Sequence, residues 1–194
     1  MDLEIDYLKL FKSMFLDELS GVYIVQVEIL LAVGALCILL PGLFLVHKSE
    51  KIRKRQVLLT YLTIVYIGIV LLITIFRRPL GGKPYSVSTK LNLGNLFGNY
   101  WEVRIAFYAI LNILLFVPFG FLVSLFCMNI KKLKAFRFIV PIVVSFLFSL
   151  SIECIQLRTG TGIFEVTDLF NNTVGGILGT VLGVIVYGIT CIII

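Results

Sequence analysis

The stretch VTDLFNNTVGGILGTVLG, residues 166–183, decides how the chain folds. Within it, Gly175, Gly179 and Gly183 recur every four residues, so one face of the predicted helix carries no side chains. Another membrane helix can approach such a face closely. The sequence leaves two partners open, namely the helix that contains Gly120 or a second protomer of a homo-oligomer.

The composition indicates a membrane protein. Of the 194 residues, 59% are hydrophobic and only 14% are charged, and the mean hydropathy is +1.05. A soluble core of this size could not bury so much apolar surface, and the composition also excludes disordered and collagen-like chains. The formal net charge of +6 comes from basic clusters beside apolar runs. We interpret these clusters as topology signals, so no nucleic-acid partner is expected.

Five apolar stretches are long enough to cross a bilayer, which takes about 20 residues of helix. They lie at residues 22–46, 57–76, 105–127, 136–157 and 173–194. The predicted fold is therefore all-α: a polytopic membrane helix bundle of about five transmembrane helices, preceded by an N-terminal amphipathic helix. The corresponding division of the chain is an interfacial helix at residues 1–20 and a transmembrane domain at residues 21–194.

The N-terminal segment has its own periodicity. Residues 2–19 place the apolar side chains Leu3, Tyr7, Leu10, Phe11 and Met14 at helical spacing, with charged residues largely on the opposite side. This pattern is typical of a helix that lies on the bilayer surface. A loose polar tail is the alternative.

Basic residues predict the orientation of the chain. The connections after the first and third stretches carry Lys48, Lys51, Arg53, Lys54 and Arg55, and Lys131, Lys132, Lys134 and Arg137. Both should be cytoplasmic, which places the N-terminus and the 77–104 and 158–172 connections outside and the C-terminus inside. The 77–104 connection is unusually basic for an outer loop, with Arg77, Arg78, Lys83, Lys90 and Arg104, which suggests a function for this cluster.

Several polar residues lie at membrane depth, where an acid at a helix centre costs about 2.5–3.5 kcal/mol. Glu153 and Gln156 share one helix face, and Arg158 follows within a turn. In the predicted topology these residues, together with Asn112, Asp168, Asn172 and Glu28, lie toward the outer ends of their helices. Their convergence predicts a polar pocket beneath the outer headgroups. The alternative is a hydrogen-bonded network that only fixes helix packing, with Arg158 neutralising Glu153, Glu165 or Asp168.

Some chemistries are excluded. The only histidine, His47, lies in a basic cluster predicted to be cytoplasmic, which removes Ser-His-Asp, Cys-His and histidine-ligated metal sites. Cys37, Cys127, Cys154 and Cys191 lie in apolar stretches without CxxC spacing, so we expect buried packing rather than disulfides or zinc. No P-loop or dinucleotide fingerprint is present, and no cofactor is expected.

Taken in order, the polar and glycine motifs resemble the VanZ-like family of bacterial multi-pass membrane proteins. The matching residues are Asn112, Phe116, Pro118 and Gly120, then Glu153 and Gln156, then Phe164, Glu165 and Asp168, then Asn172, Gly175, Gly176 and Gly179. They cover roughly residues 70–190. The chain departs from the family pattern at Thr161, where an arginine is common. The resemblance implies a place in the bacterial cell membrane, a link to the cell envelope, and reduced sensitivity to teicoplanin-type antibiotics.

Two functions follow from these residues. In the first, the pocket binds an anionic lipid or a lipid-linked cell-wall precursor, with Arg158, Arg77 and Arg78 as cations and Asn112, Gln156 and Asn172 as amide donors. Arg77 and Arg78 have a simpler alternative role as anchors at the membrane interface.

The second function is that of a membrane enzyme acting on the same material. Glu153 would serve as acid or base, Asp168 would stay ionised, and Arg158 would stabilise developing charge. A cation held by Glu153, Glu165 and Asp168 is a weaker variant of this hypothesis. A small transporter is a third class, for which the sequence shows no evident internal repeat.

Overall fold

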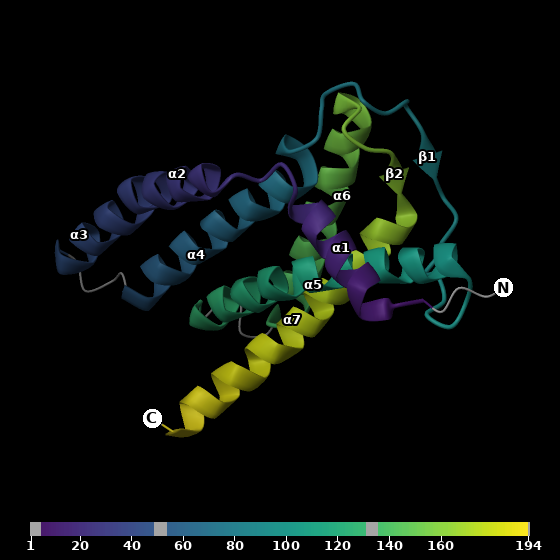
Figure 1. The fold of residues 1–194 in the computed structure, drawn as a ribbon. Coiled ribbons are helices and arrows are strands. Elements are labelled where there is room, and N and C mark those ends of the chain that lie inside the picture. Colours follow the sequence, from purple (N-terminus) through teal and green to yellow (C-terminus); the bar gives the residue numbers. More distant parts are fainter. Residues whose placement is uncertain (1–4, 49–53, 131–135, 194) are drawn as a thin grey trace.

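The structure is a computed structural model that describes residues 5–48, 54–130 and 136–193 (Figure 1). Within these residues it contains five helices that are long and apolar enough to cross a membrane. They span Ile24–His47, Lys54–Phe76, Tyr100–Met128, Ile139–Thr159 and Val166–Thr190. The predicted all-α fold with five membrane-length helices is confirmed.

The elements are named in chain order. They are α1 (Tyr7–Leu19), α2 (Ile24–Gly34), η1 (Ala35–Leu39), α3 (Leu40–Lys48), α4 (Lys54–Leu71), η2 (Leu72–Phe76), β1 (Val87–Ser88), α5 (Tyr100–Asn129), α6 (Ile139–Thr159), β2 (Phe164–Glu165) and α7 (Val166–Ile193). The segments η1 and η2 are short π-helices. The first continues α2 into α3, and the second extends α4.

Two long helices begin earlier than the apolar pattern predicts. α5 begins at Tyr100 because Asn99 caps it: the Asn99 Oδ1 atom accepts hydrogen bonds from the backbone N–H groups of Trp101 and Glu102, both at 3.1 Å. α7 begins at Val166. Hydropathy does not reveal these first turns because they contain charged and polar residues.

The glycine face of α7 lies against α5. A Cβ atom added at Gly175 or Gly179 would collide with the backbone of α5, and one added at Gly183 would collide with a side chain of α5. Gly120 of α5 meets the backbone of Gly176 in the same way. The predicted close packing is therefore confirmed, and α5 of the same chain covers the face that a second protomer would otherwise have met.

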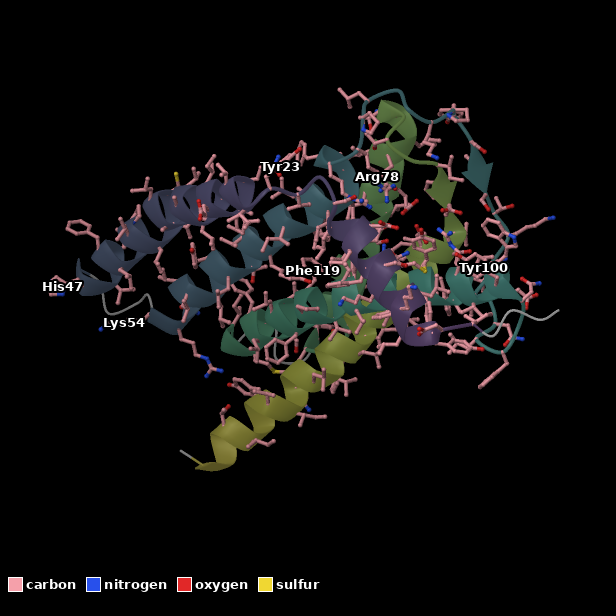
Figure 2. All side chains as sticks on the ribbon, viewed as in Figure 1. Tyr23, His47, Lys54, Arg78, Tyr100 and Phe119 are labelled. Carbon is pink, nitrogen blue, oxygen red and sulfur yellow. The ribbon has the colours of Figure 1, made fainter. Side chains whose placement is uncertain are left out.

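α5 lies in the middle of the bundle and contacts α1, α4, α6 and α7 (Figure 1). Its Phe116 and Phe119 side chains are at most 2% exposed, and their rings lie 5.9 Å apart. Val70 of α4 and Ile152 of α6 belong to the same buried cluster. Figure 2 shows Phe119 in the interior of the bundle, where it joins these helices.

α1 packs on α5 rather than standing apart from the bundle. Its Met14 side chain is 1% exposed and forms a buried cluster with Val103 and Phe107 of α5. The ring of Phe11 packs edge-on to that of Phe107, with centroids 5.2 Å apart. Residues 7–19 thus form an ordered helix and not a loose tail. The location of this helix at a bilayer surface stays a prediction.

The cysteines differ from expectation. Cys127 is buried, as predicted, but Cys37 and Cys154 are exposed on the surfaces of their helices. Both cysteines lie in helical segments that are long and apolar enough to cross a membrane. The side chain of Cys191 lies outside the described residues.

The two ends of the bundle differ in character. Figure 2 shows His47 and Lys54 at one end and Arg78 and Tyr100 at the other. The C-terminal end of α7 lies toward the same end as α3 (Figure 1).

At the other end, two connections fold together into a loop cap, which we define as residues 79–99 and 160–165. β1 pairs in parallel with β2, with Val87 opposite Phe164. The backbone N–H groups of Gly81 and Lys83 donate to the carbonyl oxygens of Thr159 and Gly160, both at 2.8 Å. These backbone bonds hold the long 77–99 connection over the ends of α6 and α7.

We expect Gly179→Ala to lower the free energy of unfolding by about 1–3 kcal/mol, because the added methyl group must push α7 away from the α5 backbone. Gly188→Ala on the same helix is the control. No atom lies within 4 Å of its added Cβ, and alanine favours a helix over glycine by about 1 kcal/mol. Unfolding of both variants in detergent would be measured, and equal stability would contradict the packing.

Candidate functional site

A cavity of about 1100 Å³ opens at the end of the bundle that carries the loop cap. Its apolar walls come mainly from α1 and α5, with Phe15, Leu19, Ile105, Ala109, Leu111, Leu114 and Leu115. Its charged and amide side chains come from segments far apart in the chain: Glu18, Arg77, Arg78, Lys83, Lys90, Asn92, Asn112, Gln156, Glu165 and Asp168. The lining of the cavity therefore combines apolar surface with charged and amide groups.

Asn112 and Asp168 meet in the cavity wall. The Asn112 Nδ2 atom donates a hydrogen bond to Asp168 Oδ1 at 2.7 Å. Asn112 lies on α5 and Asp168 lies in the first turn of α7, where the helix dipole favours a carboxylate. Asp168 lies two helical turns before Gly175 in α7, and Asn112 lies one turn before Phe116 in α5, which Gly175 contacts. The packing that joins the two helices therefore also aligns these two side chains.

Glu153 and Gln156 connect α6 to its neighbours. Glu153 is 2% exposed and does not line the cavity; its Oε2 atom accepts the backbone N–H of Glu165 at 2.9 Å and so fixes β2. Gln156 lines the cavity, and its Nε2 atom donates to the carbonyl oxygen of Thr74 at 3.0 Å. Thr74 lies in η2, near a helix end where carbonyl groups lack intrahelical partners.

Asn172 lies outside the cavity, between α6 and α7. It is 5% exposed, and its Nδ2 atom donates to Ser149 Oγ of α6 at 2.9 Å. The side chain therefore joins two helices, and it does not contact the space where a ligand would bind.

Arg77 anchors the end of α1. Its Nε atom donates to the carbonyl oxygen of Ile73 at 2.5 Å, and its Nη1 atom donates to that of Asp17 at 2.9 Å. Its Nη2 atom forms an ion pair with Glu18. This guanidinium group is thus committed to holding α1 against η2.

Arg78 lines the cavity without such commitments. Its side chain has no hydrogen bond or ion pair with any other residue in the described ranges, and it attracts the carboxylates of Glu153 and Asp168 through space. Its Nη1 atom lies close to Gly162 of the loop cap. Figure 2 shows Arg78 near the end of α6. A guanidinium in this position is available to an anionic ligand.

Arg158 is exposed and does not line the cavity. Residues 156 and 158 are about 200° apart around the helix, so Arg158 points away when Gln156 faces the cavity. Among the described residues Arg158 forms no ion pair with Glu153, Glu165 or Asp168, and Arg78, which follows η2, is the basic side chain that attracts Glu153 and Asp168 through space. Sequence proximity to Glu153 was therefore misleading.

The loop cap places part of the basic 77–104 cluster. Lys83 and Lys90 are exposed residues that line the cavity. Arg104 does not line it, because its guanidinium lies over the rings of Tyr100 and Trp101, 5.8 and 5.7 Å from their centroids. The unusual basic content of this connection was the signal for Lys83 and Lys90. Glu18 of α1, which pairs with Arg77, had no such signal in the sequence.

Two further expectations can be placed. Glu28 is exposed on α2 and does not line the cavity. Across residues 5–48, 54–130 and 136–193, no three His, Cys, Asp or Glu side chains are grouped so that they could hold a metal ion. The cation hypothesis for Glu153, Glu165 and Asp168 therefore has no geometric support.

We expect Asn112→Ala and Asp168→Ala to be coupled by about 0.5–2 kcal/mol in a double-mutant cycle of unfolding free energies. Each single change removes the same hydrogen bond, so the second change costs less once the first is made. Ser151→Ala, at an exposed site on α6 whose hydroxyl bonds only within its helix, should combine additively with Asn112→Ala. A coupling of zero for Asn112 and Asp168 would contradict the contact.

The part of the chain that forms most of the cavity is also the part that matches known proteins. Residues 62–187, more than half of the sequence, match the family model described as VanZ/LLP1. The chain is also 37% identical over 68 residues to "Protein VanZ" of Enterococcus faecium, which covers 35% of this chain and 38% of that protein. The chain therefore matches well under half of that relative's length. No solved structure matches. The matched range 62–187 contains all of the cavity residues except those from α1.

Proposed function

Since the chain belongs to the VanZ/LLP1 family, we propose that it is a cell-envelope membrane protein whose cavity binds an anionic lipid or a lipid-linked cell-wall precursor. The mixed lining of the cavity carries this proposal: Arg78, Lys83 and Lys90 supply cations, and α1 and α5 supply most of the apolar wall. An anionic lipid has the same two parts, a charged headgroup and acyl chains. In this proposal, binding underlies the teicoplanin-type resistance that the resemblance to the VanZ-like family implies.

The cations that can meet a headgroup are Arg78, Lys83 and Lys90. Arg77 is paired with Glu18, whereas these three have no ion pair with another described residue. A guanidinium can bind a phosphate or carboxylate through two parallel hydrogen bonds, and the two lysines add charge.

The amide groups have a supporting role in this proposal. The side-chain amide of Asn112 donates one hydrogen bond to Asp168, and that of Gln156 donates one to Thr74. Each amide has a second N–H group that can donate a hydrogen bond to a ligand oxygen. Asn172 is engaged between helices instead. We therefore assign charge recognition to the three cations and orientation of the ligand to Asn112 and Gln156.

We expect Arg78→Gln to reduce the amount of phosphatidylglycerol that co-purifies with the protein by about tenfold, because a hydrogen bond to a charged group contributes about 1.5–3 kcal/mol. Teicoplanin resistance conferred on a sensitive host should fall in parallel. Arg158→Gln removes the same charge outside the cavity and should change neither quantity. Equal loss in both variants would argue against a ligand site at Arg78.

We further propose that the cavity faces the outside of the cell. The support is Lys54, which belongs to the basic connection after the first predicted span and lies at the end of the bundle opposite Arg78, as a cytoplasmic residue would (Figure 2).

In a variant without native cysteines, Lys83→Cys should react with a membrane-impermeant maleimide in intact cells. Lys54→Cys should react only after the membrane is made permeable. Both side chains are exposed, so a difference in labelling reports the side of the membrane on which each residue lies and not its burial in the protein. The reverse pattern would overturn the orientation.

A membrane enzyme that acts on the same material by carboxylate chemistry is the second candidate. One observation favours it: Asp168 lines the cavity, and the positive charge of Arg78 attracts its carboxylate. Glu153 is enclosed behind β2, so in this candidate Asp168 takes the role that touches the substrate. Mass analysis of envelope lipids separates the two functions: a lipid change that Asp168→Asn abolishes favours the enzyme, and unchanged lipids favour binding alone.

A further inference from the structure

A second and smaller pocket lies in a groove between α5 and α7, with a volume of about 370 Å³. Ala106, Ile110 and Ile113 of α5 line it opposite Phe170 and Val174 of α7, and residues 93–97 of the loop cap close one side. None of the residues that line it is charged. It shares only Ala109 with the larger cavity, so it lies on a different face of α5.

One polar atom in this groove lacks a partner. Asn171 lines the groove and is 1% exposed, and its Nδ2 atom has no hydrogen-bond partner among the described residues. Buried amide donors are almost always hydrogen-bonded, because an unpaired donor in an apolar environment is costly. The Nδ2 atom itself is enclosed behind the wall of the groove, so an acceptor in the groove meets it only when the amide turns toward the groove.

The position of the groove indicates which acceptor could pair with the Asn171 N–H group. Trp101 and Tyr100, which are exposed at the start of α5, are residue types that mark the headgroup level of a bilayer. Ala106 follows Trp101 by five residues, which is about 8 Å along a helix. The groove thus begins just beneath the headgroups, where a glycerolipid carries its ester carbonyl groups and its acyl chains begin.

We propose that this groove binds one acyl chain of a glycerolipid and that the Asn171 amide turns into the groove, where Nδ2 donates a hydrogen bond to the ester carbonyl oxygen of that chain. The apolar walls hold the chain, and the amide recognises its polar end. Because no charged residue lines the groove, binding there does not depend on headgroup charge. This property separates the site from the cation-lined cavity of the proposed function.

The test compares two phosphatidylcholines with the same chains, one ester-linked and one ether-linked, bound to the full-length protein and counted by native mass spectrometry. An ether has no carbonyl group to accept the hydrogen bond. Wild-type protein should therefore retain the ester-linked lipid about fivefold better, which is the change in affinity expected from one hydrogen bond. Asn171→Leu keeps the approximate side-chain size and should abolish this preference. Equal retention of the two lipids by wild-type protein would mean that water satisfies Asn171 and would overturn the proposal.

A second variant tests the groove without altering the amide. Val174→Phe fills the groove and should reduce retention of both lipids, whereas Val181→Phe, at an exposed position further along α7, should not. Equal retention by these two variants would contradict a chain in the groove. Arg78→Gln should leave the ester preference intact, so failure at the larger cavity and failure at this groove give different results.

Discussion

The backbone contact between α5 and α7 positions everything at the cavity end of the bundle. Between membrane helices there is no hydrophobic driving force, so close van der Waals packing has to hold them together. Gly175 and Gly179 permit that packing because any side chain there would strike the α5 backbone at Ile113 and Val117. Just before these contacts in α7, Asp168 reaches Asn112. The Asn112–Asp168 part of the cavity wall thus depends on this close packing.

The polar residues at this end divide into two groups with different tasks. Glu153, Asn172 and Arg77 form contacts that hold β2, α6 and α1 in place, which agrees with the network alternative considered for the intramembrane polar residues. Arg78 and the loop-cap cations are not engaged in this way among the described residues. In this account structural support and charge recognition are carried by different side chains, whereas Asn112 and Gln156 serve both the protein contacts and the orientation of the ligand. In this account the buried network determines the shape of the cavity, and the cations near its opening determine which headgroups it accepts.

Local patterns predicted much of this arrangement. Hydropathy identified the five long helices, and the four-residue glycine spacing identified the closely packed face of α7. The parallel pairing of Val87 with Phe164 could not be predicted, because two-residue strands leave no periodic signal and their pairing joins distant parts of the chain. That pairing brings the loop cap over the cavity. Arg158 was favoured because it is near Glu153 in sequence, whereas helical rotation turns it away.

The most direct test of this account is cross-linking of Asn112→Cys to Asp168→Cys in native membranes, in a chain whose four original cysteines are replaced by alanine. A short bifunctional thiol reagent should join the two residues within one chain, because the wild-type side chains are in hydrogen-bond contact. The protein should stay monomeric on a denaturing gel, and mass spectrometry should find the α5–α7 linked peptide. Cross-linked dimers, or labelling of both thiols without any cross-link, would contradict the α5–α7 packing on which the cavity depends.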